Sequence, residues 1–144
     1  MVTESKPHWQ PLTLLPVVAM MIDEVVQNSE DQHETFSEAK DTPHVLDDAT
    51  VSRAIRLYKA QLEDVQLYRE QLTRWQAQPL TGDQRREVDR LLGQLPRLRQ
   101  LSEAILEMLD EIKEGTIDKI LAKSDLEVGL EYLLRKPGDD PEAT

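Results

Sequence analysis

The fold follows from residues 72–88, LTRWQAQPLTGDQRREV, which hold a helix break between two matching apolar series. Seven positions at helical spacing precede Leu80 and seven follow it, and the members of each pair are equally distant from Leu80. A chain folded at Leu80 brings the two series together in register, as in an antiparallel helical hairpin. From the turn outward, the pairs are Leu72 with Val88, Arg69 with Leu91, Val65 with Leu95, Leu62 with Leu98, Tyr58 with Ser102, Ile55 with Ile105 and Val51 with Leu109.

Signals at the break set the ends of the two long helices. Pro79 stops the first helix, and Thr81 begins a capping box that opens the second. The pattern predicts helices over about 49–77 and 82–114, roughly 44 and 50 Å long. Pro96 removes one hydrogen bond inside the second helix, so we expect a kink there.

Shorter segments flank this hairpin and complete the predicted domain, 1–136. Only 4% of the residues are aromatic and 5 are glycines, so Leu, Val and Ile must build the core, which suits an all-α up-and-down bundle. The segment before the hairpin is acidic and poor in apolar side chains, which is typical of a linker. The predicted segments are a shorter helix over about 13–28, the acidic linker 29–48, two short helices over 117–123 and 125–135, and a disordered tail, 137–144.

Each long helix carries a second apolar stripe beside the first. A hairpin alone would leave these stripes in water, so another element or subunit must cover them. A helix over 13–28 is too short to cover roughly 44 Å. The shortfall predicts a homodimer built across the hairpins, with a stripe that includes Leu57, Tyr68, Leu92, Leu101, Met108 and Ile112.

The composition narrows the classes of protein. The chain has no cysteine, which excludes disulfides, thiolate chemistry and cysteine-based zinc sites and fits a cytoplasmic protein. The longest apolar run, 12–22, is interrupted by Thr13 and Pro16 and is shorter than the roughly 20 residues that span a bilayer. That run also lacks the flanks of a signal peptide. We therefore expect no membrane association.

Arginines gather at the predicted hairpin tip. Residues 69–99 contain seven arginines against four acidic residues, although the whole chain has a net charge of −11. Arginine and tryptophan are favoured in protein interfaces, so an acidic protein segment, or the chain's own 29–48 segment, is a candidate partner. The net charge makes nucleic acid an unlikely partner, and a solvated surface is the alternative. The predicted partner-binding residues are Arg69, Arg74, Trp75, Arg85, Arg86 and Arg90.

Candidate catalytic and metal-binding residues are sparse. Glu30 and His33 have the Glu-x-x-His spacing of helical di-iron sites, but such sites need a second motif, so a solvated acidic loop is the preferred interpretation. The three histidines all precede residue 45, and no glycine-rich phosphate loop occurs. We assign no catalytic residue, metal ligand or cofactor. Carboxylates on the last long helix form either a solvated face or a metal site; they are Glu103, Glu107, Asp110, Glu111 and Glu114.

The sequence does not determine the function. The absence of a catalytic constellation and the surplus of apolar helix favour a non-catalytic protein-interaction or scaffold protein, and whether the chain is an enzyme stays open. One alternative is a metal-dependent hydrolase that uses the carboxylates of 103–114. The other is binding of a nucleic acid or an acidic partner at the arginine-rich tip.

Overall fold

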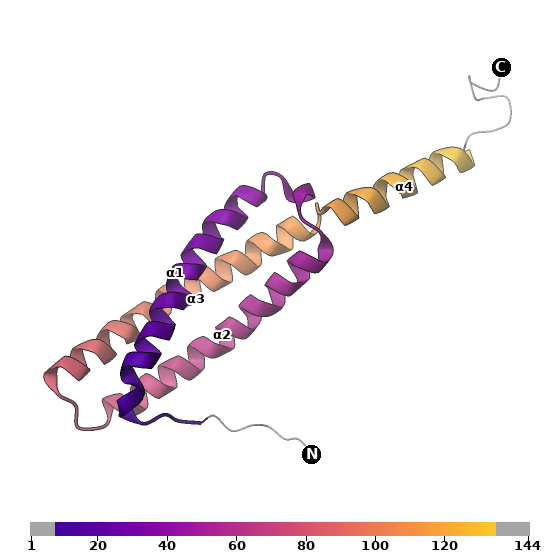
Figure 1. Cartoon of the computed structure of the whole chain (residues 1–144). Helices are drawn as coiled ribbons and strands as arrows, with labels where there is room; N and C mark the ends of the chain where they lie inside the picture. Colours follow the sequence, from indigo (N-terminus) through magenta and orange to yellow (C-terminus); the bar gives the residue numbers. More distant parts are fainter. Residues whose placement is uncertain (1–7, 135–144) are drawn as a thin grey trace, which may run out of the picture.

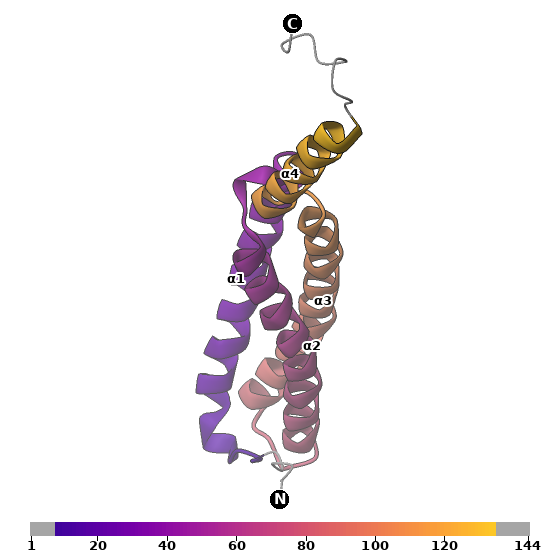
Figure 2. The ribbon, with the colours of Figure 1, turned by 90° about the vertical axis from the view of Figure 1, so that its right-hand side faces the viewer.

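A computed structural model describes residues 8–134, without the side chains of residues 123–128 and 131–132. The regular secondary structure of the described residues is helical, with no strand among them. Three long helices pack side by side as an up-and-down bundle (Figures 1 and 2). They are α1 (Leu15–Ala39), α2 (Asp48–Gln76) and α3 (Gly82–Lys113), with short 3-10 turns η1 (Leu12–Leu14) and η2 (Pro43–Val45) before α1 and α2.

The α2–α3 hairpin begins and ends where the sequence predicts. The Thr81 hydroxyl accepts a hydrogen bond from the Gln84 amide at 3.1 Å, and the Thr81 amide donates to Gln84 Oε1 at 2.9 Å. This capping box satisfies amides that the first turn of α3 would leave free. At the other end, Asp47 caps α2, because its side chain accepts a hydrogen bond from the Thr50 amide at 2.8 Å. The helix α3 continues through Pro96.

The mirrored positions form the core. Eleven of the fourteen positions are buried, and the seven on α3 are fully enclosed. The three that are not buried are Ile55, Leu62 and Arg69, all on α2. Arg69 is exposed, as its charge requires. The apolar side chains form two clusters: a tip cluster near the α2–α3 turn, which includes Ile22, and a base cluster at the opposite end, which includes Phe36.

A polar layer lies between the two clusters. The Gln61 side-chain amide donates to Ser29 Oγ at 2.9 Å and to Ser102 Oγ at 2.8 Å, so it joins all three helices. Ser102 Oγ in turn donates to the Leu98 carbonyl at 2.8 Å. The two serines are almost completely buried. Since buried polar groups need partners, this layer fixes the register of the helices.

The acidic linker is a wrong prediction. Residues 29–39 continue α1, and only the segment from Lys40 to Asp47, which contains η2, connects it to α2. The helical spacing of Ile22, Val26, Ser29 and Phe36 persists through the acidic stretch, and these side chains are buried. The acidic side chains lie on the other sides of the helix. Residues 29–39 therefore have enough apolar side chains for one buried stripe, although their overall apolar content is low.

The longer α1 also removes the reason given for a homodimer. At 25 residues it is roughly 38 Å long and covers most of the hairpin, whereas the predicted helix would have stopped at about residue 28. Most of the second stripe of α3 is buried in this bundle: Leu101, Met108 and Ile112 are buried, and Leu92 is partly buried. Within one chain, α1 thus covers much of the surface for which the sequence analysis predicts a second subunit.

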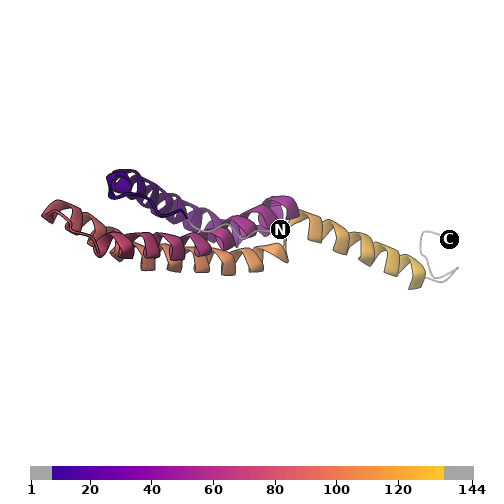
Figure 3. The same cartoon turned by 90° about the horizontal axis from the view of Figure 1, so that it is seen from below.

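The C-terminal part is one helix rather than two. The helix α4 (Ile117–Leu134) is continuous and projects away from the base of the bundle (Figures 1 and 3). The Thr116 hydroxyl accepts from the Lys119 amide at 3.3 Å and so caps α4. The predicted tail, 137–144, lies outside the described residues. No helix among residues 8–134 has the length and apolar character that crossing a membrane requires.

Candidate functional site

The predicted arginine tip does not form one continuous cationic face. Trp75 is fully buried, and its indole nitrogen donates to the Gln10 carbonyl at 2.9 Å, so it belongs to the core. The Arg74 guanidinium stacks over the Trp9 ring, 4.3 Å from its centroid, and lies 3.7 Å from Glu70.

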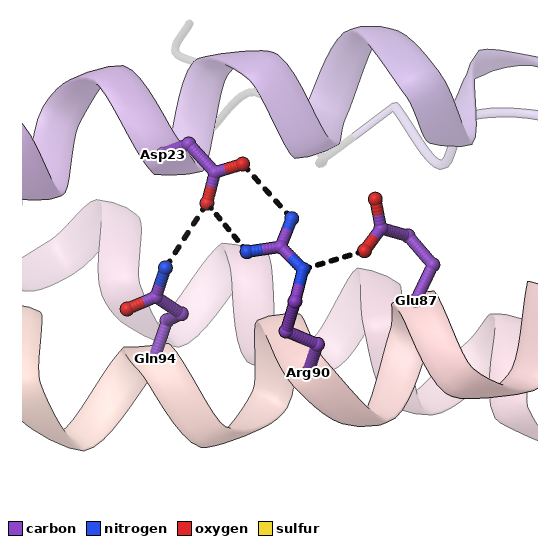
Figure 4. Close-up of polar contacts among 4 residues, drawn as sticks. All are labelled: Asp23, Glu87, Arg90 and Gln94. Carbon is purple, nitrogen blue, oxygen red and sulfur yellow. Dashed lines mark hydrogen bonds and ion pairs between the residues drawn. The ribbon is translucent and has the colours of Figure 1, made fainter.

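Two further tip arginines face carboxylates. Arg86 pairs with Asp83. Arg90 donates to both oxygens of Asp23, at 2.9 and 2.8 Å, and to Glu87 at 2.6 Å (Figure 4). Gln94 adds a hydrogen bond to Asp23 at 3.0 Å. The contacts that Arg90 and Gln94 make with Asp23 join α1 to α3.

The bonds from Arg90 hold the pKa of the Asp23 carboxyl below its ordinary value, and the Coulombic attraction of the guanidinium acts in the same direction. The acidic stretch of α1 supplies one more partner, because Glu30 lies 3.2 Å from Arg97. Arg90 and Arg97 therefore bind α1 to α3 at two points. Among the side chains that the structure describes, no ion pair involves Arg69 or Arg85, the other two predicted partner-binding arginines.

The carboxylates of α3 form a solvated face. All five are exposed, and two of them pair with cations of the same chain: Glu103 with Arg99 at 3.5 Å, and Glu111 with Lys40 at 3.6 Å. In the part of the chain that the structure describes, no three His, Asp or Glu side chains gather as metal ligands would. His33, on α1, has no such neighbours.

The second apolar stripe is buried to different extents on α3 and on α2. Leu101, Met108 and Ile112 on α3 are buried, and Leu92 is partly buried. On α2, by contrast, Tyr68 is only partly buried and Leu57 is 59% exposed. The part of the stripe that stays open is therefore on α2, facing α1.

An apolar groove lies between α1 and α2, because both helices pack along α3 and make few close contacts with each other. It contains two hollows, each lined from both helices. The hollow nearer the tip has a volume of about 350 Å³ and is lined by His8, Trp9, Gln10, Leu14, Val17, Val18, Met21, Leu67, Tyr68 and Gln71. The hollow nearer the base has a volume of about 530 Å³ and is lined by Val25, Asn28, Ser29, Gln32, Phe36, Ala54, Leu57, Tyr58 and Gln61.

The sequence contains a signal for this groove. From Leu14, at the end of η1, along α1, positions that line the groove recur at alternating intervals of four and three residues, which is the spacing of one helix facing another. The predicted helix, 13–28, includes all members of this series except the last, Gln32. The series is Leu14, Val18, Met21, Val25, Asn28 and Gln32.

Exposed apolar side chains also occur on α4. Ile120 is 40% exposed and Leu133 is 79% exposed, with other leucines between these values.

Comparisons with protein-family models, with curated proteins and with solved structures found no match. The groove and the exposed side chains of α4 are therefore the features that bear on function.

Proposed function

We propose that this protein is a non-catalytic interaction protein whose α1–α2 groove receives an apolar helix. The observation that carries the proposal is the groove itself, which is open, mainly apolar and bordered by two long helices. Helices bind in such grooves by inserting side chains at intervals of three and four residues.

The dimensions favour a helix over a small molecule. The two hollows follow one another along α1 and α2, and α2 alone is roughly 44 Å long. A three-helix arrangement with an open side also resembles a four-helix bundle that lacks one member. A fourth helix would shield Val17, Met21 and Leu67, which are each 42–45% exposed.

The other candidate functions have weaker support. A metal-dependent hydrolase would need clustered ligands, and the carboxylates of α3 are exposed and partly paired with cations. Binding of an acidic partner at the tip would have to compete with the acidic residues that already face Arg74, Arg86 and Arg90.

Two neighbouring methionines allow a matched test. Met21 lines the groove, whereas Met20 is 63% exposed and lies outside it. We expect the Met21→Glu variant to capture at least tenfold less partner protein from a source-cell extract, because the charge would enter an apolar contact. Met20→Glu should capture as much as the unmodified chain.

Circular dichroism and thermal unfolding of both variants check that the fold is retained. If folded Met21→Glu captures the same proteins in the same amounts as the unmodified chain, the groove is not the binding site. Leu67→Glu, on the α2 side, repeats the test from the opposite wall.

A further inference from the structure

We infer that the α1–α2 groove is filled by α4 of a second copy of the chain, in a reciprocal homodimer. The inference rests on the proposed function and names its partner. It joins two surfaces that one chain leaves uncovered: the apolar groove, and the helix that projects from the base of the bundle.

The helix α4 needs a partner. It extends beyond the base of the bundle instead of packing along it (Figures 1 and 3). Among the α4 side chains that the structure describes, exposed apolar ones occur near both ends of the helix. A helix of this kind is stable when neighbouring helices enclose it. The exposed members are Ile120, Leu121, Leu130, Leu133 and Leu134.

The junction before α4 directs it away from its own groove. Asp48 accepts hydrogen bonds from the Thr116 hydroxyl at 2.7 Å and from the Lys119 ammonium at 2.9 Å. The Ile117 amide donates to the Leu46 carbonyl at 2.9 Å. These bonds tie the first turn of α4 to the start of α2.

Close packing at the junction adds a second restraint. A Cβ atom on Gly115 would lie 2.6 Å from Cγ of Pro43, so the turn approaches η2 as closely as a glycine allows. Folding α4 back over its own groove would break the Asp48 bonds and this contact. A neighbouring chain can supply the same helix without either change.

The two surfaces fit each other in size and number. At 18 residues α4 is roughly 27 Å long, which is shorter than the groove-lining α2. Each copy offers one helix and one groove. A two-fold exchange therefore covers both surfaces in both copies and closes the assembly.

The lack of cysteine makes a direct test possible, because any introduced cysteine is unique. We would place single cysteines in the groove (Leu57→Cys, Leu67→Cys) and on α4 (Leu130→Cys, Leu133→Cys). A groove variant mixed with an α4 variant should give a disulfide-linked dimer on mild oxidation. Gln100→Cys, on the exposed side of α3, is the control and should give none with either.

Light scattering of the full chain gives an independent measurement. We expect a dimer for the unmodified chain and for Met20→Glu, and a monomer for Met21→Glu and for the double variant Leu133→Glu/Leu134→Glu. Circular dichroism shows whether these variants keep their helices. A monomeric unmodified chain at micromolar concentration would overturn the inference. A dimer that persists in both Met21→Glu and Leu133→Glu/Leu134→Glu would overturn it as well.

The outcomes separate this inference from the proposed function. A monomeric chain that still captures another protein through Met21 keeps the proposed function and rejects the second copy as its partner. A cross-link that forms within one chain carrying both Leu57→Cys and Leu130→Cys, at monomer mass, assigns the groove to the chain's own α4 and rejects the dimer. A monomer without capture rejects both.

Discussion

The two sides of α1 differ in how they meet their neighbours. Toward α3, Ile22 and Val26 are buried, and ion pairs from Asp23, Glu30 and Lys40 cross to α3. Toward α2, within the described residues, one side-chain hydrogen bond from Gln61 to Ser29 joins the two helices, no ion pair does, and the apolar side chains stay partly exposed.

This contrast separates stability from binding. The α1–α3 seam combines complete burial with charge pairing, which is what a permanent contact needs. The α1–α2 groove has apolar side chains without matching neighbours, which is typical of a surface that binds. Substitutions on the two sides should therefore affect different measurements.

The largest expected effect comes from truncating the seam. Ile22→Ala should lower the free energy of unfolding by about 2–5 kcal/mol, because it opens a cavity at a fully buried position. Met21→Ala, one residue away but 43% exposed, should cost less than about 1 kcal/mol. Urea denaturation of both variants at a concentration below any dimerisation measures the difference. Equal losses would mean that the groove is as closed as the seam.

The polar layer comes next. Gln61→Leu should cost about 1–3 kcal/mol, because it leaves the buried Ser29 hydroxyl without its Gln61 partner. Gln66→Leu, at an exposed position of α2, is the control and should change stability by no more than about 0.5 kcal/mol. A Gln61→Leu variant as stable as its control would show that the layer adds nothing to stability.

A smaller effect is expected for the pair of Asp23 and Arg90. Both side chains are more than 40% exposed, so solvent screens them, and a double-mutant cycle should give about 0.2–1 kcal/mol. Because folding lowers the pKa of Asp23, this contribution is complete above the ordinary carboxyl range and is lost as the pH falls through the lowered pKa. Urea denaturation of Asp23→Asn and of the unmodified chain between pH 7 and 2 should converge in acid, and a constant difference would contradict this assignment.

The smallest effect has the opposite sign. Asp64 lies near Tyr68 on α2, and although its side chain reaches solvent, partial desolvation raises the pKa of its carboxyl, as does Glu63. Folding then favours the protonated form, so the penalty appears as the pH rises through the raised pKa. Asp64→Asn should be slightly more stable than the unmodified chain at pH 7, by less than about 0.5 kcal/mol, and equal to it in acid. A variant less stable at pH 7 would contradict the prediction.

The hairpin is predictable from the sequence because its signals are local. Pro79 and the capping box at Thr81 mark the turn, and the mirrored apolar positions need no information beyond their spacing. The length of α1 is harder to predict, because the acidic composition of 29–39 indicates a linker whereas its helical spacing indicates a helix, and the structure has the helix. A helix that ends at residue 28 leaves part of the hairpin uncovered and so predicts a second subunit, whereas α1 of the same chain covers that part.

The candidate site was harder to predict, because it depends on long-range contacts. Asp23 and Arg90 are 67 residues apart, and no local pattern shows that they face each other. The local density of arginines therefore predicts a binding surface at the tip, although several of these arginines pair with carboxylates of the same chain. The groove likewise depends on the angle at which α1 crosses the hairpin, which the spacing of side chains does not give.

The mirrored pairing of α2 and α3 also bears on how the chain folds. The pair closest to the turn, Leu72 with Val88, is also the closest in sequence, and each following pair encloses the one before it. Once Thr81 has capped α3, each new contact adds only a small loop-closure cost. We expect the hairpin to zip from its turn toward its base, with α1 docking onto a surface that already exists. A circular permutant opened between Pro79 and Thr81 would remove this order and slow refolding, while the final packing of α2 against α3 stayed the same.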